Sequence, residues 1–202
     1  MKLYISRHAQ TEWNKVMRLQ GWKDSPLSEK GLREAHLLKD YLADIKFDRI
    51  YTSDKKRAID TAKIIKGPRH IEIVELKELR ELGMGDWEGK LISEIMEEEG
   101  DLFDKYLNFP LSYPAPLGED IPSLFKRVEF ALEKIEGHGG EKILLVSHGN
   151  TIRALLVILK KLGMDYYKKA PIYPGTALSI FKKEANAWIS MVEGDQSHCL
   201  DE

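Results

Sequence analysis

Hydrophobic positions along the chain follow two alternating spacings. Short apolar runs rich in β-prone residues predict strands at residues 2–5, 48–52, 70–74, 142–147, 176–182 and 187–193. Between these runs, apolar side chains recur every three or four positions, which predicts helices at residues 28–45, 54–66, 91–106, 120–135 and 151–162. The alternation of strand and helix predicts an α/β fold, a three-layer α/β/α domain with a largely parallel central sheet.

The ends of several elements are marked by residue type. Ser28 and Asp120 are candidate N-caps, and Gly67-Pro68 is expected to end the second helix. The run 142–147, KILLVS, is nearly all apolar, which is typical of a strand that a parallel sheet buries on both faces. In the fourth helix we expect an interruption at Gly100, and the proline-rich segment 108–120 is expected to form a lid or cap loop.

Length and composition limit the class of protein. With 202 residues the default is a single domain, 1–202, carrying a small cap or lid insertion at about 90–120. Hydrophobic residues make up 43% and charged residues 32%, which is a globular composition. The net charge of -2 argues against nucleic-acid binding. Any binding of phosphate must therefore depend on local cations.

Cysteine usage and hydropathy bear on the compartment. The single Cys199 permits no intramolecular disulfide, which favours a reducing environment. No apolar run reaches the roughly 18 residues of a membrane span, and none precedes the first strand, so we expect a cytoplasmic protein without a membrane partner. Lys and Glu outnumber Asn and Gln, a balance seen in heat-adapted proteins.

Three polar clusters follow predicted strands directly. They are Arg7-His8, the segment 53–57, and His148-Gly149. In open parallel sheets ligands bind at the carboxyl ends of the strands, where these clusters can converge. Taken singly, Arg7-His8 would be a surface feature, Arg57 a solvated helix residue, and His148 a satisfied core histidine at a strand end. A metal site at His8 and His148 finds no further ligands at a familiar spacing, so we expect no metal.

An ordered set of motifs carries a family resemblance. They are ISRHAQTEWN, DSPLSEKG, YTSDKKRAIDTA, LRELGMGDWEG and LLVSHGNTIRAL, and together they span the chain. The set resembles the histidine phosphatase superfamily, which includes the cofactor-dependent phosphoglycerate mutases. The signature of that family is R-H-G-x-T-x-x-N, from which this chain departs at Ala9. An alanine there requires an ordinary φ or a shifted loop.

The resemblance implies a role for each matching residue. His8 would attack phosphorus and carry the phosphoryl group, and Glu81 would protonate the leaving alkoxide and later activate water. Arg7, Arg57 and His148 would bind the phosphoryl oxygens and lower the pKa of His8. The remaining candidates would donate or accept hydrogen bonds to phosphate or substrate: Thr11, Asn14, Gln20, Gly21 and Gly149. No metal or other cofactor is implied.

Two enzymatic outcomes share such a site. The mutases carry E-R-x-Y-G at the acid position and paired arginines in the inserted segment, whereas this chain has Glu81-Leu82-Gly83-Met84-Gly85 and no arginine between 90 and 120. Hydrolysis of a phosphomonoester is therefore favoured, with a small phosphorylated metabolite as the partner. The mutase activity, and a non-catalytic phosphate-binding regulatory module, remain as alternatives.

The leaving group is not defined by the motifs. Phe103, Tyr106, Phe109 and Tyr113 either pack in the core or line a substrate pocket. Among family members, α-ribazole 5′-phosphate phosphatases and broad-specificity phosphatases share the chain size and the GMGDWEG type of loop. A monomer or a homodimer is expected from the same resemblance.

Overall fold

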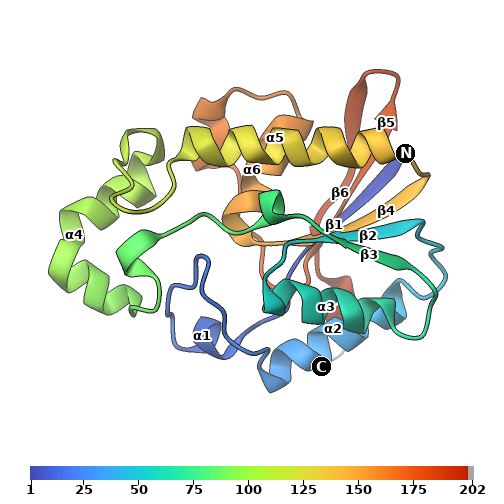
Figure 1. Ribbon diagram of the computed structural model, residues 1–202, viewed down its shortest axis with the longest axis horizontal. Helices are drawn as coiled ribbons and strands as arrows, with labels where there is room; N and C mark the ends of the chain where they lie inside the picture. Colours follow the sequence, from blue (N-terminus) through green and yellow to red (C-terminus); the bar gives the residue numbers. More distant parts are fainter. Residues whose placement is uncertain (200–202) are drawn as a thin grey trace.

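A six-stranded sheet forms the centre of the molecule (Figure 1). The computed structural model describes residues 1–199. The strand order is β3-β2-β4-β1-β5-β6. The strands are β1 Lys2–Arg7, β2 Arg49–Thr52, β3 Glu72–Glu75, β4 Lys142–Ser147, β5 Leu178–Glu184 and β6 Ala187–Asp195. The first four strands pair in parallel and the last two add as antiparallel strands, which confirms the largely parallel sheet.

Helices cover both faces of the sheet. They are α1 Glu12–Lys15, α2 Glu29–Tyr41, α3 Lys56–Lys66, α4 Ile92–Asn108, α5 Ile121–His138 and α6 Gly149–Leu159. Helices α2 and α3 lie on one face, and α5 and α6 lie on the other (Figure 1). Because side chains alternate across a strand, Tyr4 joins the core under α2 and α3 while Leu3 and Ile5 join the core under α5 and α6. The three-layer fold is confirmed.

Short 3₁₀ turns occupy the connections, at Lys77–Leu79 (η1), Gly85–Trp87 (η2), Pro110–Ser112 (η3), Met164–Lys169 (η4) and Ser197–Cys199 (η5). The predicted caps are confirmed, since the Ser28 side chain accepts from the Gly31 N–H and the Asp120 side chain accepts from the Ser123 N–H. The short helix α1 was not predicted. It is stabilised by a local capping box between Thr11 and Asn14. Its four residues are too few to show a hydrophobic periodicity.

Several boundaries differ from the sequence prediction. Helix α2 ends at Tyr41, four residues before Ile45, and its Leu32 is 43% exposed, so the buried face is narrower than the apolar spacing indicated. Helix α6 begins at Gly149, because His148 already serves as its N-cap residue. Helix α4 bends at Glu99 and not at Gly100, and the indole Nε1 of Trp87 donates to the Glu99 carboxylate at 3.0 Å there.

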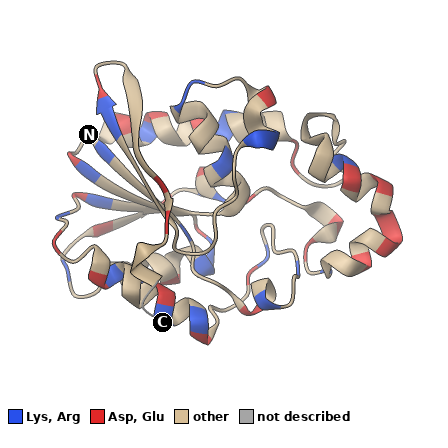
Figure 2. Cartoon of the chain, turned by 180° about the vertical axis from the view of Figure 1, so that it is seen from behind, with Lys and Arg blue, Asp and Glu red and all other residues tan. Residues whose placement is uncertain are grey.

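Helix α4 and the segment after it extend to one side of the sheet (Figure 1). Acidic side chains gather on the outer surface of α4 (Figure 2), including Glu94, Glu97, Glu98, Asp101 and Asp104. Inside, Trp87 packs against Phe103, Tyr106 and Tyr113. No helix among residues 1–199 combines the length and hydropathy needed to cross a membrane.

Candidate active site

The carboxyl ends of β1, β2 and β4 bring the predicted polar clusters together. The His8 N–H donates to the Ser147 carbonyl at 2.8 Å, and the imidazole rings of His8 and His148 lie 5.2 Å apart between centroids. Arg57 comes from the first turn of α3, which follows β2. Three segments that are far apart in the sequence thus meet at one edge of the sheet.

His8 presents one ring nitrogen to the site. Its Nδ1 lies 2.8 Å from the carbonyl oxygen of Ala9, and because a carbonyl can only accept, Nδ1 carries the proton and Nε2 keeps its lone pair. Burial lowers the pKa of His8 well below its usual value of 6.5, and the charges of Arg57 and Arg7 lower it further. His8 is therefore a neutral imidazole with a free nucleophilic nitrogen.

Ala9 is accommodated without strain at the position where the family signature has glycine. It is fully buried, its φ lies outside the positive region, and its N–H donates to the Thr61 hydroxyl at 3.1 Å. The carbonyl of the same residue fixes the His8 ring. An ordinary φ was one of the two expectations for this alanine.

Two buried guanidinium groups flank His8. Arg57 donates from Nη1 to Asp24 Oδ1 at 2.8 Å and to the Lys23 carbonyl at 2.7 Å, and from Nη2 to the Gly21 carbonyl at 2.8 Å. Arg7 donates from Nη1 to the Tyr173 carbonyl at 3.0 Å. Within residues 1–199 the Nε atom of each is buried without a hydrogen-bond partner. Each guanidinium thus keeps a donor for an anion.

His148 is hydrogen-bonded through one ring nitrogen only. Its Nε2 lies 2.6 Å from the Ser53 hydroxyl oxygen, and its Nδ1 is buried with no partner in the described chain. The Ser53 oxygen also accepts from the Lys55 N–H at 3.3 Å. Burial and the charge of Arg57 lower the pKa of His148 well below 6.5. His148 is therefore a neutral imidazole.

Glu81 lies at the amino end of α6. Its Oε1 accepts from the Leu82 N–H at 2.8 Å and from the Asn150 N–H at 3.0 Å. A Cβ added at Gly149 would come within 3.6 Å of Glu81 Oε2 and 3.7 Å of Arg7 Cζ, so the carboxylate and guanidinium both lie close to that backbone. The positive end of the helix stabilises the carboxylate.

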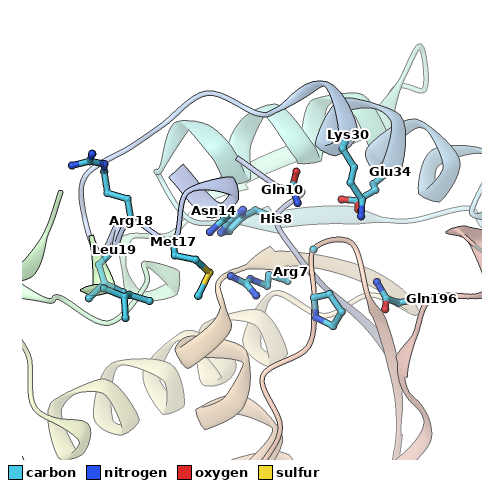
Figure 3. A pocket seen from close by; sticks show the side chains of 13 residues that line it. Arg7, His8, Gln10, Asn14, Met17, Arg18, Leu19, Lys30, Glu34 and Gln196 are labelled. Atoms are coloured by element: carbon cyan, nitrogen blue, oxygen red, sulfur yellow. The ribbon is translucent and has the colours of Figure 1, made fainter. Parts of the chain in front are cut away.

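A cavity of about 180 Å³ connects these groups. Eight of the ten predicted site residues line it: Arg7, His8, Asn14, Gln20, Gly21, Arg57, Glu81 and Gly149. A larger cavity of about 540 Å³ shares Arg7, His8 and Asn14 and opens between α2 and the segment before β5 (Figure 3). Its other wall includes Met17, Lys30 and Gln196. Substrate can therefore extend from the phosphoryl position in two directions.

The other two predicted site residues, Thr11 and His148, do not line this cavity. Thr11 is fully buried, and its hydroxyl accepts from the Gln20 amide at 2.9 Å and contacts Asn14 Oδ1 at 3.0 Å. It therefore holds the two cavity-lining residues in place. His148 is also fully buried, 5.2 Å from His8 between ring centroids. Direct substrate contact by Thr11, predicted from the sequence, is not supported by this placement.

Several lining residues were not predicted as site residues. Tyr106, Asn150, Arg18, Leu19 and Ile172 line the smaller cavity. Asn150 stands in the quoted motif beside Gly149, and Tyr106 was one of four aromatics left open between core and pocket. Met84 also lines the cavity, whereas Trp87 is buried in the aromatic cluster. Arg18 and Ile172 carry no signal in the sequence pattern.

Comparison with known proteins agrees with this geometry. Residues 3–195 match the model of the histidine phosphatase superfamily (branch 1). The chain belongs to this superfamily and is a phosphatase. Among residues 1–199, no group of three or more His, Cys, Asp and Glu side chains is arranged to hold a metal ion.

Individual relatives cover most of the chain. "Phosphoserine phosphatase 1" of Hydrogenobacter thermophilus is 35% identical over 83% of this chain and 79% of its own length. "Probable phosphoglycerate mutase GpmB" of Yersinia pestis is 32% identical over 98% of this chain and 94% of its own. Among solved structures, Bacillus stearothermophilus YhfR has a TM-score of 0.93 and 37% identity, covering 98% of both chains.

Gly21 offers a test of the loop that faces Arg57. Its φ is +51°, and an added Cβ would lie 2.2 Å from Glu88 Oε1, whose carboxylate also accepts from the Trp22 and Met84 N–H groups. We expect Gly21→Ala to cost about 1–3 kcal/mol of stability, because alanine is strained at this positive φ and its Cβ displaces the Glu88 carboxylate from its hydrogen bonds. We also expect it to lower kcat/KM.

Urea unfolding and steady-state kinetics measure both effects. The matched control is Gly137→Ala in α5, where an added Cβ meets nothing within 4 Å, so stability should stay equal or rise by up to about 1 kcal/mol. Equal stability of the two variants would contradict the expectation for Gly21.

The buried histidines predict a pH dependence of stability. Because the pKa of His8 is below 6.5 in the folded protein, the unfolded chain binds more protons below that pH. This difference in proton binding does not lower the free energy of unfolding above pH 6.5, and it lowers it increasingly as the pH falls. We expect the midpoint of thermal unfolding to fall less between pH 7.5 and pH 5 in His8→Gln than in the wild type. If the unfolding midpoints of the two proteins fell equally with pH, burial would not disfavour the protonated form of His8.

Proposed function

We propose that the protein hydrolyses small phosphomonoesters through a phosphohistidine formed on His8. The observation that carries the proposal is the His8 ring, whose Nδ1 is bonded to the Ala9 carbonyl so that Nε2 faces a cavity lined by Arg7 and Arg57. This arrangement supplies a nucleophile and positive charge without a metal ion.

The first half-reaction forms the phosphoenzyme. His8 Nε2 attacks phosphorus, a bond to Nε2 forms, and the bond from phosphorus to the ester oxygen breaks. The phosphoryl oxygens accept from the free Nε–H groups of Arg7 and Arg57, which stabilise the charge as it is transferred. Protonated Glu81 gives its proton to the leaving alkoxide. The alcohol then leaves.

The second half-reaction regenerates the enzyme. Ionised Glu81 takes a proton from water, and the resulting oxygen attacks phosphorus as the Nε2–phosphorus bond breaks. Inorganic phosphate is released, His8 recovers its lone pair, and Glu81 recovers its proton. Glu81 thus gives one proton to the alcohol and recovers one from water, and the second proton of that water leaves on inorganic phosphate.

Hydrolysis is favoured over mutase activity by the residues around Glu81. The sequence after it is Leu82-Gly83-Met84-Gly85, and residues 90–120 contain no arginine to hold the carboxylate of a phosphoglycerate. Candidate substrates for a panel are phosphoserine, named for the relative from Hydrogenobacter thermophilus, and α-ribazole 5′-phosphate. 3-Phosphoglycerate in the same panel tests the mutase alternative.

The proposal is tested with p-nitrophenyl phosphate in excess EDTA. We expect the wild type to turn over and His8→Ala to be inactive, with phosphate trapped on the wild-type protein as an acid-labile phosphohistidine after rapid quenching. Activity that is equal in both proteins would remove His8 from the mechanism. Loss of wild-type activity in EDTA would exclude a metal-free reaction.

A further inference from the structure

Two tyrosine hydroxyls fix the side-chain amide of Asn150 from opposite sides. The Tyr167 hydroxyl, on η4, donates to Asn150 Oδ1 at 2.8 Å. Asn150 Nδ2 in turn donates to the hydroxyl oxygen of Tyr106, on α4, at 3.2 Å. Because the Tyr167 bond orients the amide, Tyr106 accepts from Asn150 and does not donate to it. The Tyr106 hydroxyl proton is therefore left without a partner in the described chain.

The Tyr106 side chain belongs to the wall of the active-site cavity. Tyr106 lines the cavity together with Glu81, Met84 and Gly149. Burial and the charge of Glu81 raise the pKa of Tyr106 to about 12, so the hydroxyl stays protonated at neutral pH. Its ring packs against Phe103 at 5.9 Å and Tyr113 at 5.6 Å between centroids, which fixes its direction.

The hydroxyl is also placed relative to the leaving oxygen. The backbone N–H of Asn150 holds the Glu81 carboxylate at 3.0 Å, and the side chain of the same residue holds Tyr106. One residue thus positions both the proposed proton donor for the ester oxygen and a second donor beside it. A substrate without an acceptor at this position leaves the Tyr106 hydroxyl desolvated and unpaired. Binding of such a substrate is therefore strongly disfavoured in free energy.

We propose that Tyr106 donates a hydrogen bond to an oxygen acceptor on the leaving alcohol, and that it thereby selects phosphomonoesters with a carboxylate close to the ester carbon. This inference rests on the proposed function. Arg7, whose guanidinium carbon lies close to the backbone of Gly149 on the same cavity wall, compensates the charge of such a carboxylate. The protonated form of Glu81, which the first half-reaction requires, adds no negative charge against it.

The test compares two substrates that differ by one group. O-phosphoserine and O-phosphoethanolamine share the phosphoester and the ammonium group, and only the first has a carboxylate. We expect the ratio of their kcat/KM values, phosphoserine over phosphoethanolamine, to fall about tenfold in Tyr106→Phe. The control is Tyr113→Phe, which removes a phenol hydroxyl from the same aromatic cluster but does not line the cavity. Its ratio should equal that of the wild type.

The outcomes separate this inference from the proposed function. An unchanged ratio in Tyr106→Phe, an equal fall in Tyr113→Phe, or a wild type that does not prefer phosphoserine overturns the role of Tyr106. In each case His8-dependent hydrolysis of p-nitrophenyl phosphate still supports the proposed function. If that hydrolysis is independent of His8, the proposed function fails and the inference fails with it.

Discussion

Replacing Glu81 by Gln should lower kcat for an alkyl phosphate such as propyl phosphate by about 10²–10⁴-fold. The amide oxygen of glutamine can still accept from the Leu82 and Asn150 N–H groups, so the geometry of the loop is retained. What is lost is the proton for the leaving alkoxide. An alkoxide is a strong base, and its departure without that proton is slow.

The same variant should lose much less activity with p-nitrophenyl phosphate when a single turnover is measured. The p-nitrophenolate anion is stable without a proton, so formation of the phosphoenzyme proceeds without the acid. Quenched-flow measurement of phosphohistidine formation with both substrates gives the comparison. Equal losses with the two leaving groups would assign Glu81 to binding or positioning and not to proton transfer.

Replacing Arg57 by Met should destabilise the protein and remove most of its activity. The substitution removes the guanidinium donors of the Asp24 carboxylate and of the Gly21 and Lys23 carbonyls, and leaves Asp24 with backbone donors only. Breaking a buried ion pair costs about 3–5 kcal/mol, and the lower value is expected here because Asp24 is 31% exposed. Loss of a phosphoryl-binding cation lowers kcat/KM in addition.

Arg49→Met provides the matched control. Arg49 begins β2, the strand that leads toward Arg57, but its pair with Glu72 is exposed at 34% and 65%, so its loss should cost about 1 kcal/mol or less. Urea unfolding measures the loss of stability in Arg57→Met and in Arg49→Met. The kcat/KM of each variant is measured without urea, where the protein is folded. If the two variants were equally stable, the bonds from Arg57 to the loop at 21–24 would not contribute to folding.

The strands and the positions of the catalytic clusters were predictable because they depend on local pattern. The run KILLVS and the polar residues after it specify a buried strand and a site at its end, and β4 lies where the sequence placed it. The end of α2 was less accurate, since Leu42 and Ile45 continue the apolar spacing while the backbone leaves the helix after Tyr41. Periodicity records which face is apolar and does not record where hydrogen bonding stops.

The parts of the site that the sequence missed depend on contacts between distant segments. Thr11 carries the same side chain whether it binds substrate or holds Gln20, and only the folded chain shows the second arrangement. Tyr106 reaches the cavity because the bend at Glu99 and the contact with Trp87 set the direction of α4. The interruption expected at Gly100 lies one residue from the bend, but the contact with Trp87 has no signal in the residue pattern.

The strand order has a consequence for how the chain folds during synthesis. β1 is made first, yet its two neighbours in the sheet are β4 and β5, which begin at Lys142 and Leu178. Both edges of β1 stay unpaired until the ribosome has released β4, and the edge that faces β5 stays unpaired until β5 is released as well. Pairings of such high sequence separation fold slowly and expose the nascent chain to aggregation. Fragments that end before β5 should therefore need chaperones to remain in solution.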